Sequence, residues 1–350
     1  MSTTTTHGAV TRAWRTGLRR RTVAVSAVLL AVMLALFVLA LLLGAAGLTP
    51  AEVWSGFTGT ASRSVRFVVL DLRLPRALAA VLVGVCLGLA GAVFQSVLRN
   101  PLASPDVLGV TGSAGAAGVW GVLALNLSGL RLSLLAIAGG VVGALLIAAL
   151  TWRRGISGLR LVLVGVGVAA FAGALTSYLL TTSDLRDAAS AYTWLVGSLN
   201  GTGWPVVAVT AGLAALASVA LVPQLRGLRA LELGDETATA LGIRPDRTRA
   251  LVLLTGVVLA AVAVGAAGPL AFVALMAPQV ARRLVGRTSL SLVASAAIGG
   301  ALVTGSDLIA QHAIPSVTLP AGVVTGVIGA PYLAWVLARN DSVRRPGGSS

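Results

Sequence analysis

Lysine is absent from this chain of 350 residues, and all 26 of its basic residues are arginines. A chain without lysine cannot build the phosphate-binding loop G-x-x-x-x-G-K-[ST]. If ATP drives this protein, another chain must therefore hydrolyse it. In that case ATP and magnesium would be held by the partner, and we expect this chain to bind no cofactor of its own.

Cysteine and histidine are also scarce. Cys86, inside an apolar run, is the only cysteine, and His7 and His312 are the only histidines. An internal disulfide is therefore excluded, and no cysteine–histidine cluster has the spacing of a metal site. A metal that crosses a membrane through this protein is expected to travel inside a chelate.

Charge is the third shortage. Only 11% of the residues are charged and 57% are hydrophobic, whereas soluble domains usually carry about 25% charged residues. These proportions argue against a large soluble helical protein. The formal net charge of +15 does not indicate nucleic acid, because the arginines cluster between the apolar runs, where loops would leave a membrane. The expected partner is a lipid bilayer.

Ten apolar runs predict an all-α polytopic membrane protein. A span needs about 20 residues, and the first run is too long for the core of a signal peptide. The expected spans are 23–43, 75–98, 107–125, 132–152, 159–180, 206–223, 248–267, 270–284, 289–310 and 320–337. The eighth is short, so we expect it to be tilted, broken or shielded by neighbours. Residues 1–22 form a basic N-terminal tail, 23–338 one transmembrane domain, and 339–350 a C-terminal tail.

The arginines decide the orientation of these spans. Ten spans place both termini on one side, and cytoplasmic loops collect basic residues. With the N-terminus inside, twenty of the 26 arginines lie inside, which predicts cytoplasmic termini. The six on the outside are Arg63, Arg66, Arg73, Arg76, Arg131 and Arg186, and four of them crowd into the segment before the second span.

The largest inner loop, about residues 224–247, predicts two very short helices. Gly234 can end the first in a left-handed conformation, and Asp235 can cap the N-terminus of the second, whose first turn favours Glu236. Gly242 can end the second helix. A helix this short is not stable alone in water, so it must dock on its own bundle or on a partner. An ordinary capped loop would show the same features.

The segment QSVLRNPLASPDVLGVTGSAGAAG, residues 95–118, interrupts the apolar chain with polar residues, glycines and two prolines. Asn100 precedes Pro101 and is therefore held extended. Non-helical backbone near a membrane is tolerated only where protein buries it or water reaches it. Such broken segments often line a transport pathway, although a passive tight turn would also explain the prolines.

Four blocks of the sequence carry a resemblance to a known family. They are LRLPRALAAVLVGVCLGLAGAVFQSVLRNPLASPDVLGV, LELGDETATALGI, GPLAFVALMAPQVARRLVG and LPAGVVTGVIGAPYLAWVL. In this order they resemble the iron-siderophore and cobalamin permeases, the membrane subunits of type II ABC importers, from about residue 30 to residue 339. The resemblance implies the type II importer permease fold, with ten spans per chain in a bacterial cytoplasmic membrane.

The resemblance also implies partners and site residues. A second permease chain, two cytoplasmic ATP-binding subunits and an extracytoplasmic binding lipoprotein that delivers the ligand would complete the importer. The inner loop is similar to a coupling segment that sits in a cleft of the ATPase; its residues here are Leu233, Gly234, Asp235, Glu236, Ala238, Leu241 and Gly242. The gate and pathway candidates are Gln95, Asn100, Pro101 and Leu102. Arg73 and Arg76 match arginines that receive acidic residues of the binding protein. The fifth and tenth spans should line much of the path.

Two departures from the family pattern bear on the ligand. Gln279 stands where a histidine is common, which resembles the catecholate-type siderophore permeases more than the cobalamin ones. Gln311 stands where the cobalamin importers have a further outer arginine. We therefore expect a ferric-siderophore permease that does no chemistry itself. A cobalamin or haem permease is the nearest alternative. A proton-coupled secondary transporter would need Asp307 as its proton carrier, and a membrane enzyme would need convergent catalytic groups that the spans lack.

Overall fold

Helices dominate the computed structural model of the protein, which describes residues 3–44, 47–151, 158–286, 291–314 and 317–341. They are α1 (Thr3–Leu42), α2 (Pro50–Thr58), α3 (Arg63–Arg66), α4 (Leu74–Val97), α5 (Val110–Leu125), α6 (Gly129–Thr151), α7 (Gly158–Thr181), α8 (Leu185–Val196), α9 (Trp204–Leu221), α10 (Leu225–Glu232), α11 (Asp235–Ala240), α12 (Pro245–Ala267), α13 (Val273–Val285), α14 (Leu292–His312) and α15 (Ala321–Asp341). A π-helical turn, Phe67–Arg73, joins α3 to α4.

Each expected span coincides with a helix: α1, α4, α5, α6, α7, α9, α12, α13, α14 and α15. Within the described part of the chain, seven helices are long and apolar enough to cross a bilayer, and α5 and α15 contain shorter apolar stretches. The eighth span, α13, has only 13 residues, and residues 273–279 are all buried. Neighbouring helices therefore shield it, as a short span requires. The prediction of an all-α polytopic membrane protein is confirmed.

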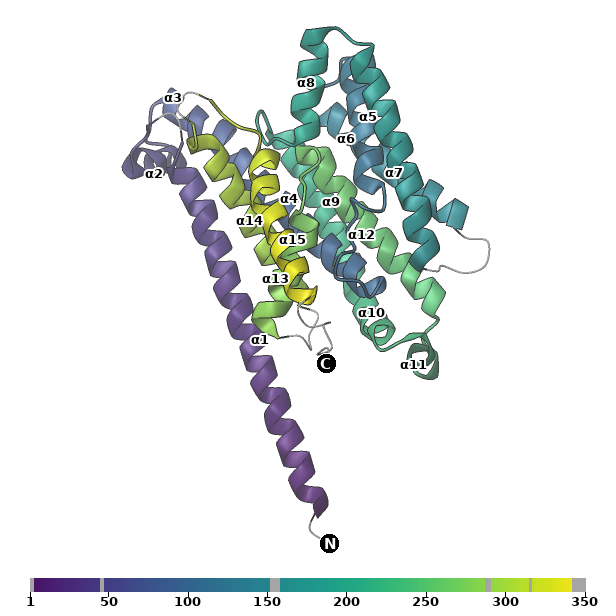
Figure 1. Ribbon diagram of the computed structural model, residues 1–350. Coiled ribbons are helices and arrows are strands. Elements are labelled where there is room, and N and C mark those ends of the chain that lie inside the picture. The colour runs from purple at the N-terminus through teal and green to yellow at the C-terminus, as the bar shows by residue number, and fades with distance from the viewer. Residues whose placement is uncertain (1–2, 45–46, 152–157, 287–290, 315–316, 342–350) are drawn as a thin grey trace, which may run out of the picture.

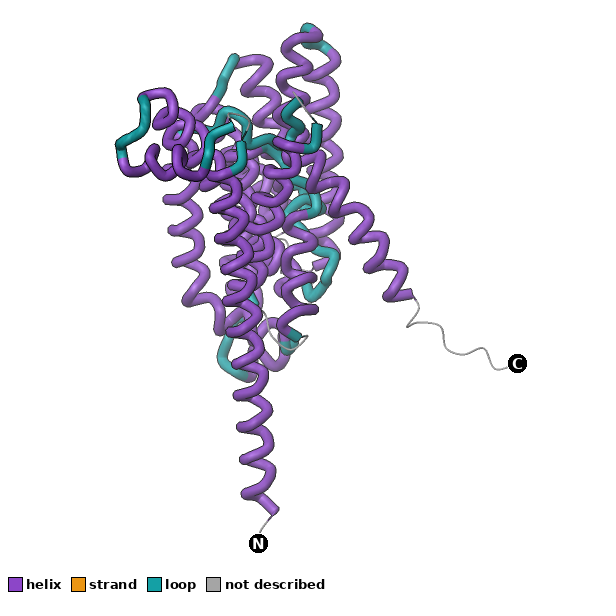
Figure 2. The backbone as a smooth tube through the Cα atoms, turned by 90° about the vertical axis from the view of Figure 1, so that its left-hand side faces the viewer, coloured by secondary structure: helices purple, strands orange, loops and turns teal. Residues whose placement is uncertain are grey.

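The short helices lie at the two ends of the bundle. In Figure 1, α2, α3 and α8 lie at the top, and α10 and α11 lie at the bottom, toward which α1 begins and α15 ends. Helix α1 packs along α14, and its N-terminal half projects beyond the rest of the bundle (Figure 2). Of the seven long apolar helices α1 is the least buried, whereas α4 and α12 are the most buried. The helix that leads into the broken segment is thus held in the centre.

Glycines let α4 lie directly against α14. A Cβ atom added to Gly84 would overlap the backbone of Gly299, and one added to Gly88 would overlap the carbonyl group of Ser295. In lipid, this close approach of two backbones replaces the hydrophobic effect as the source of cohesion. The contact fixes α4 against its neighbour along the length that ends at the broken segment.

Some elements are not visible in the hydropathy of the sequence. Helix α8 is amphipathic, and its stretch LRDAASAYTWLV has too few apolar residues to register as a span. Helix α3 and the π-helical turn extend α4 into one continuous helical segment from Arg63 to Val97. The expected N-terminal tail, residues 1–22, is helical from Thr3 and continues into the first span.

Candidate functional site

The inner loop forms two short helices, α10 and α11, as expected. Ala238 of α11 is fully buried and packs against Leu231 of α10 and Ile243. Leu233 and Leu241, which flank α11, are 67% and 62% exposed. Helix α11 therefore docks on its own bundle through one face and presents two leucines to the solvent. Burying such leucines against a partner is favourable, at about 1.5–3 kcal/mol for a fully buried side chain.

The ends of α11 differ in part from the expectation. Gly234 has φ 111° and ψ 156°, so its backbone is extended rather than left-handed helical, although only glycine adopts this conformation readily. Asp235 is the first helical residue, so Gly234 and not Asp235 stands at the cap position, and the Asp235 carboxylate is held in ion pairs. Glu236 lies in the first turn, and Gly242, with φ 77°, follows the helix, both as expected.

The segment between α4 and α5, residues 98–109, contains no helix. We call it the gate segment. Asn100 shapes its first turn: the side-chain oxygen accepts a hydrogen bond of 2.9 Å from the backbone N–H of Leu102, an arrangement typical of asparagine in turns. The preceding residue, Arg99, has φ 50°, which is uncommon outside glycine. This turn leaves the side chain of Leu102 39% exposed.

Two glutamines fasten the gate segment and the end of α4 to α13. Gln95 is buried; its Nε2 donates a hydrogen bond of 2.9 Å to the carbonyl of Leu275, and its Oε1 accepts one of 2.8 Å from Arg282. Gln279 donates a hydrogen bond of 2.8 Å from Nε2 to the carbonyl of Pro101. Gln279, one of the two residues that depart from the family pattern, thus contacts a gate candidate directly.

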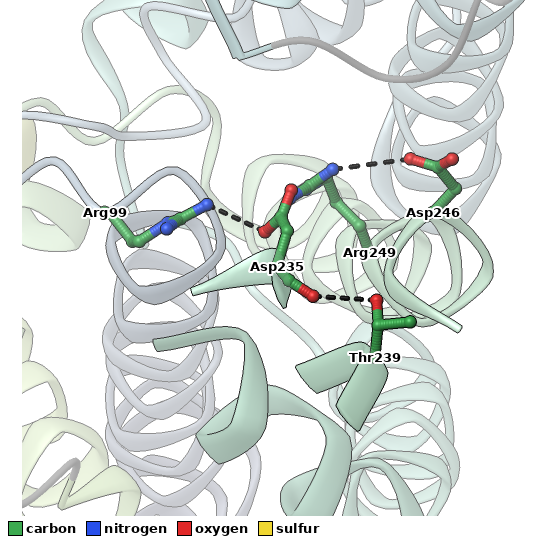
Figure 3. Close-up of polar contacts among 5 residues, drawn as sticks. All are labelled: Arg99, Asp235, Thr239, Asp246 and Arg249. Carbon is green, nitrogen blue, oxygen red and sulfur yellow. Dashed lines mark hydrogen bonds and ion pairs between the residues drawn. The ribbon is translucent and has the colours of Figure 1, made fainter. Parts of the chain in front are cut away.

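An ion-pair cluster connects the gate segment to α11 and α12 (Figure 3). Arg99 donates to Asp235 over 2.8 Å, and Arg249 Nη2 lies 3.0 Å from both carboxylate oxygens of Asp235. Arg249 also lies 3.5 Å from Asp246. Sequence reasoning did not identify Arg99 or Arg249 as site residues. The available signal in the sequence was the position of Arg99 directly before Asn100 and Pro101. The ion pair itself could not be read from the sequence, because 136 residues separate Arg99 from Asp235.

A cavity of about 710 Å³ lies beside the gate segment. It is bounded by the gate segment, the first turn of α5, the end of α8, the residues before α13 and its first turn, and α15. The tenth expected span, α15, thus contributes to the lining, and the fifth, α7, contributes no lining residue. Asp106 is the one acidic residue in this lining, and its carboxylate accepts a hydrogen bond of 2.6 Å from the Thr111 hydroxyl. Burial raises the pKa of Asp106 above its usual value, and the Thr111 hydrogen bond opposes that rise. Otherwise the wall is mostly apolar.

Of the two docking candidates, Arg73 is buried at the outer end of the bundle. Its Nη1 donates to the carbonyls of Leu41 and Leu42, over 2.9 and 3.1 Å. These are the last carbonyls of α1, which lack partners within their own helix. Arg73 therefore caps the C-terminus of α1, and whether it also contacts a binding protein stays a prediction.

The second candidate, Arg76, forms a two-point ion pair with Asp307 of α14. The distances are 2.9 Å from Nε to Oδ2 and 2.8 Å from Nη2 to Oδ1. The Asp307 side chain is only 3% exposed, and Gln311 donates a further hydrogen bond of 2.8 Å to Oδ2. Arg76 thus joins α4 to α14, and its role in docking also stays a prediction.

The long apolar helices define a polytopic membrane protein, and comparison with known proteins identifies it as a transport subunit. The chain belongs to the FecCD transport family, whose model matches residues 31–339. Its relatives include the ferric enterobactin transport system permease protein FepG of Escherichia coli, which is 42% identical over 85% of this chain and 90% of the relative. The achromobactin transport system permease protein CbrC of Dickeya dadantii is 38% identical over 89% of this chain and 90% of the relative.

A solved structure supports the same assignment. It is assigned to the metal-chelate type ABC transporters and has an inward-facing conformation. It superposes with a TM-score of 0.79 at 26% sequence identity and covers 90% of this chain and 99% of its own chain. The expected family and fold are therefore confirmed, and the chain is a transporter permease.

Proposed function

We propose that this chain is the permease subunit of an importer that moves a ferric siderophore across a bacterial cytoplasmic membrane. The observation that carries the proposal is the match along most of the chain to permeases named for ferric enterobactin and achromobactin. The single cysteine is buried and so cannot serve as a surface ligand for bare iron. Iron enclosed in a chelate needs no protein ligands on its path.

ATP and magnesium bind to separate ATPase subunits, and α11 is where this chain meets one of them. The support is the pair of exposed leucines at positions 233 and 241 beside a helix of six residues. Such a short helix needs a docking surface, and an apolar contact in a cleft of the ATPase would bury both side chains. Movement of that cleft would then displace α10 and α11.

The gate segment and its cavity form the inner part of the path. Gln95, Asn100, Pro101 and Leu102 are the gate residues, and the exposed Leu102 side chain closes the path against a second permease chain, identical or paralogous. The cavity supports this role, because its wall includes Leu102 and is mostly apolar. An apolar wall without a ring of charges suits a large chelate that must bind weakly and pass through.

On the outer side, an extracytoplasmic binding lipoprotein delivers the ligand, and Arg73 and Arg76 contribute to its docking. The internal contacts of the two arginines hold the outer ends of α1, α4 and α14 together. These contacts support a second contribution to docking besides charge, because they fix the shape of the surface on which the lipoprotein would dock. Electrostatic complementarity with an acidic partner would set the association rate and the register of docking.

The two rival functions fare differently. A proton-coupled transporter would need Asp307 free to take up and release a proton, whereas its carboxylate is bound by Arg76 and Gln311. A cobalamin or haem permease would share the fold and the ATPase. The names of the relatives favour iron chelates over either ligand.

The test is uptake by the complete importer in proteoliposomes or cells, with radioiron-labelled ferric enterobactin and ferric citrate as probes and cobalamin and haem as competing ligands. We expect uptake of at least one ferric chelate that continues when the proton gradient is collapsed and ATP is maintained. Purified permease alone should bind no ATP. Uptake of cobalamin or haem with no uptake of any iron chelate would contradict the proposed ligand, and uptake lost with the proton gradient would contradict the proposed energy source.

A further inference from the structure

Asp235, the first residue of α11, is shared by two arginines from different parts of the chain (Figure 3). Arg249 comes from α12, one of the most buried spans. Arg99 comes from the gate segment, directly before Asn100. One carboxylate therefore connects the bundle, the candidate coupling helix and the candidate gate.

The two contacts of Asp235 differ in strength. Arg249 approaches both carboxylate oxygens, and its side chain is only 9% exposed. Arg99 meets one oxygen, and the exposed fractions of the two side chains are 46% and 47%. Ion pairs so exposed contribute about 0.2–1 kcal/mol. The Arg249 contact therefore anchors α11 to α12, while the Arg99 contact can form and break between conformations.

A weak contact of this kind suits a link between moving parts. On its other side, the gate segment is tied to α13 through the hydrogen bond from Gln279 to Pro101. A displacement of α11 can thus pull on the gate segment through Arg99, while α13 holds Pro101, two residues further along the chain. A contact that is present in one conformation and absent in another shifts the equilibrium between them by its own free energy.

We infer that Asp235 is a positioning residue that makes the gate segment follow the coupling helix through Arg99. This inference rests on the proposed function, in which α11 meets an ATPase. When the ATPase displaces α11, the Arg99–Asp235 pair transmits the movement to the turn that carries Leu102. A change in the Arg99 contact of about 0.2–1 kcal/mol corresponds to a shift of the gate equilibrium of up to about fivefold.

The experiment measures the gate directly and needs no chelate. The complete importer, in inverted membrane vesicles, carries Cys86→Ala and Leu102→Cys, and the introduced thiol is labelled with a membrane-impermeant maleimide. The readout is the ratio of labelling rates with and without ATP plus vanadate. With Arg99 intact we expect ATP to change the rate. Arg99→Gln and Asp235→Asn should each reduce this change by about 1.4- to fivefold, whereas Arg99→Lys should retain part of it.

Arg20→Gln is the matched control, because Arg20 is an exposed arginine where the apolar span of α1 begins, outside the inner loop that holds the candidate coupling helix. It should leave both the labelling ratio and basal ATP hydrolysis unchanged. The double variant Arg99→Gln with Asp235→Asn should lose no more than Asp235→Asn alone, because both changes remove one link. An unchanged ratio in Arg99→Gln, an equal loss in Arg20→Gln, or no ATP response with Arg99 intact would each overturn the inference. Failure of iron uptake would instead contradict the proposed ligand.

Discussion

Replacement of Asp307 by asparagine tests whether this acid is structural. The carboxylate is almost fully buried, is held at two points by Arg76 and receives a hydrogen bond from Gln311. Removing one partner of a buried ion pair typically costs about 3–5 kcal/mol, because the other charge stays buried. The Arg76 side chain is 18% exposed and can regain some water. We therefore expect Asp307→Asn to lower the free energy of unfolding by about 3 kcal/mol, the lower end of that range.

The assay is thermal unfolding of the purified permease in lipid nanodiscs at one fixed scan rate, since unfolding of a membrane protein is often irreversible. A loss of this size should lower the apparent Tm by about 5 °C or more. The matched control is Asp184→Asn, because Asp184 is an exposed acid on the outer side whose side chain makes no capping hydrogen bond. Arg76→Gln with Asp307→Asn should be more stable than the sum of the single changes predicts.

Uptake separates the structural reading from its rival. Asp307→Asn should retain iron uptake in proportion to the amount of folded permease. A normal apparent Tm together with complete loss of uptake would refute the structural reasoning and favour Asp307 as a proton carrier.

The remaining predictions concern the two ends of the bundle. Leu241→Asp should abolish transport and the stimulation of ATP hydrolysis by the loaded binding protein while leaving permease levels normal, because Leu241 is 62% exposed; normal stimulation would contradict the coupling role of α11. Arg73→Glu with Arg76→Glu should weaken association with the binding protein most at low salt, where screening is least. That change also breaks internal contacts of Arg73 and Arg76. Arg63→Glu with Arg66→Glu therefore tests the outer charge without breaking those contacts. If the affinity for the binding protein depends on salt as in the wild type for both double variants, the docking role is contradicted.

The spans could be predicted from sequence because a bilayer imposes length and hydrophobicity on every helix that crosses it. Even the short eighth run was recognisable, and burial by its neighbours explains how it is tolerated. Helix α8 could not be predicted in this way. Its amphipathic stretch Leu185–Val196 lies outside the spans, where hydropathy carries no such constraint.

For the candidate site too, the sequence predicted features that depend on local residues and not those that depend on packing between helices. Local chemistry predicted the break at Asn100–Pro101, the two short helices and the stop at Gly242, because proline, asparagine and glycine act through their own backbone. Asp235 was misassigned as a cap, and its ion pairs were not predicted, because Arg99 and Arg249 are brought to it only by the packing of α4 and α12. Capping rules describe a helix in isolation, whereas these charge-assisted contacts come from other parts of the chain.

The outer arginines show what such packing adds to a charge count. The positive-inside bias treats each arginine as a free charge, yet Arg73 and Arg76 are bound by helix-end carbonyls and by a buried acid. A planar guanidinium with five donors can meet several acceptors at once, which a flexible ammonium does less well. These two exceptions to the bias therefore follow from packing between helices. Arg63 and Arg66 are exposed and make no ion pair with any described residue, so the outer surface keeps a positive charge that packing leaves unexplained and that an acidic partner would complement.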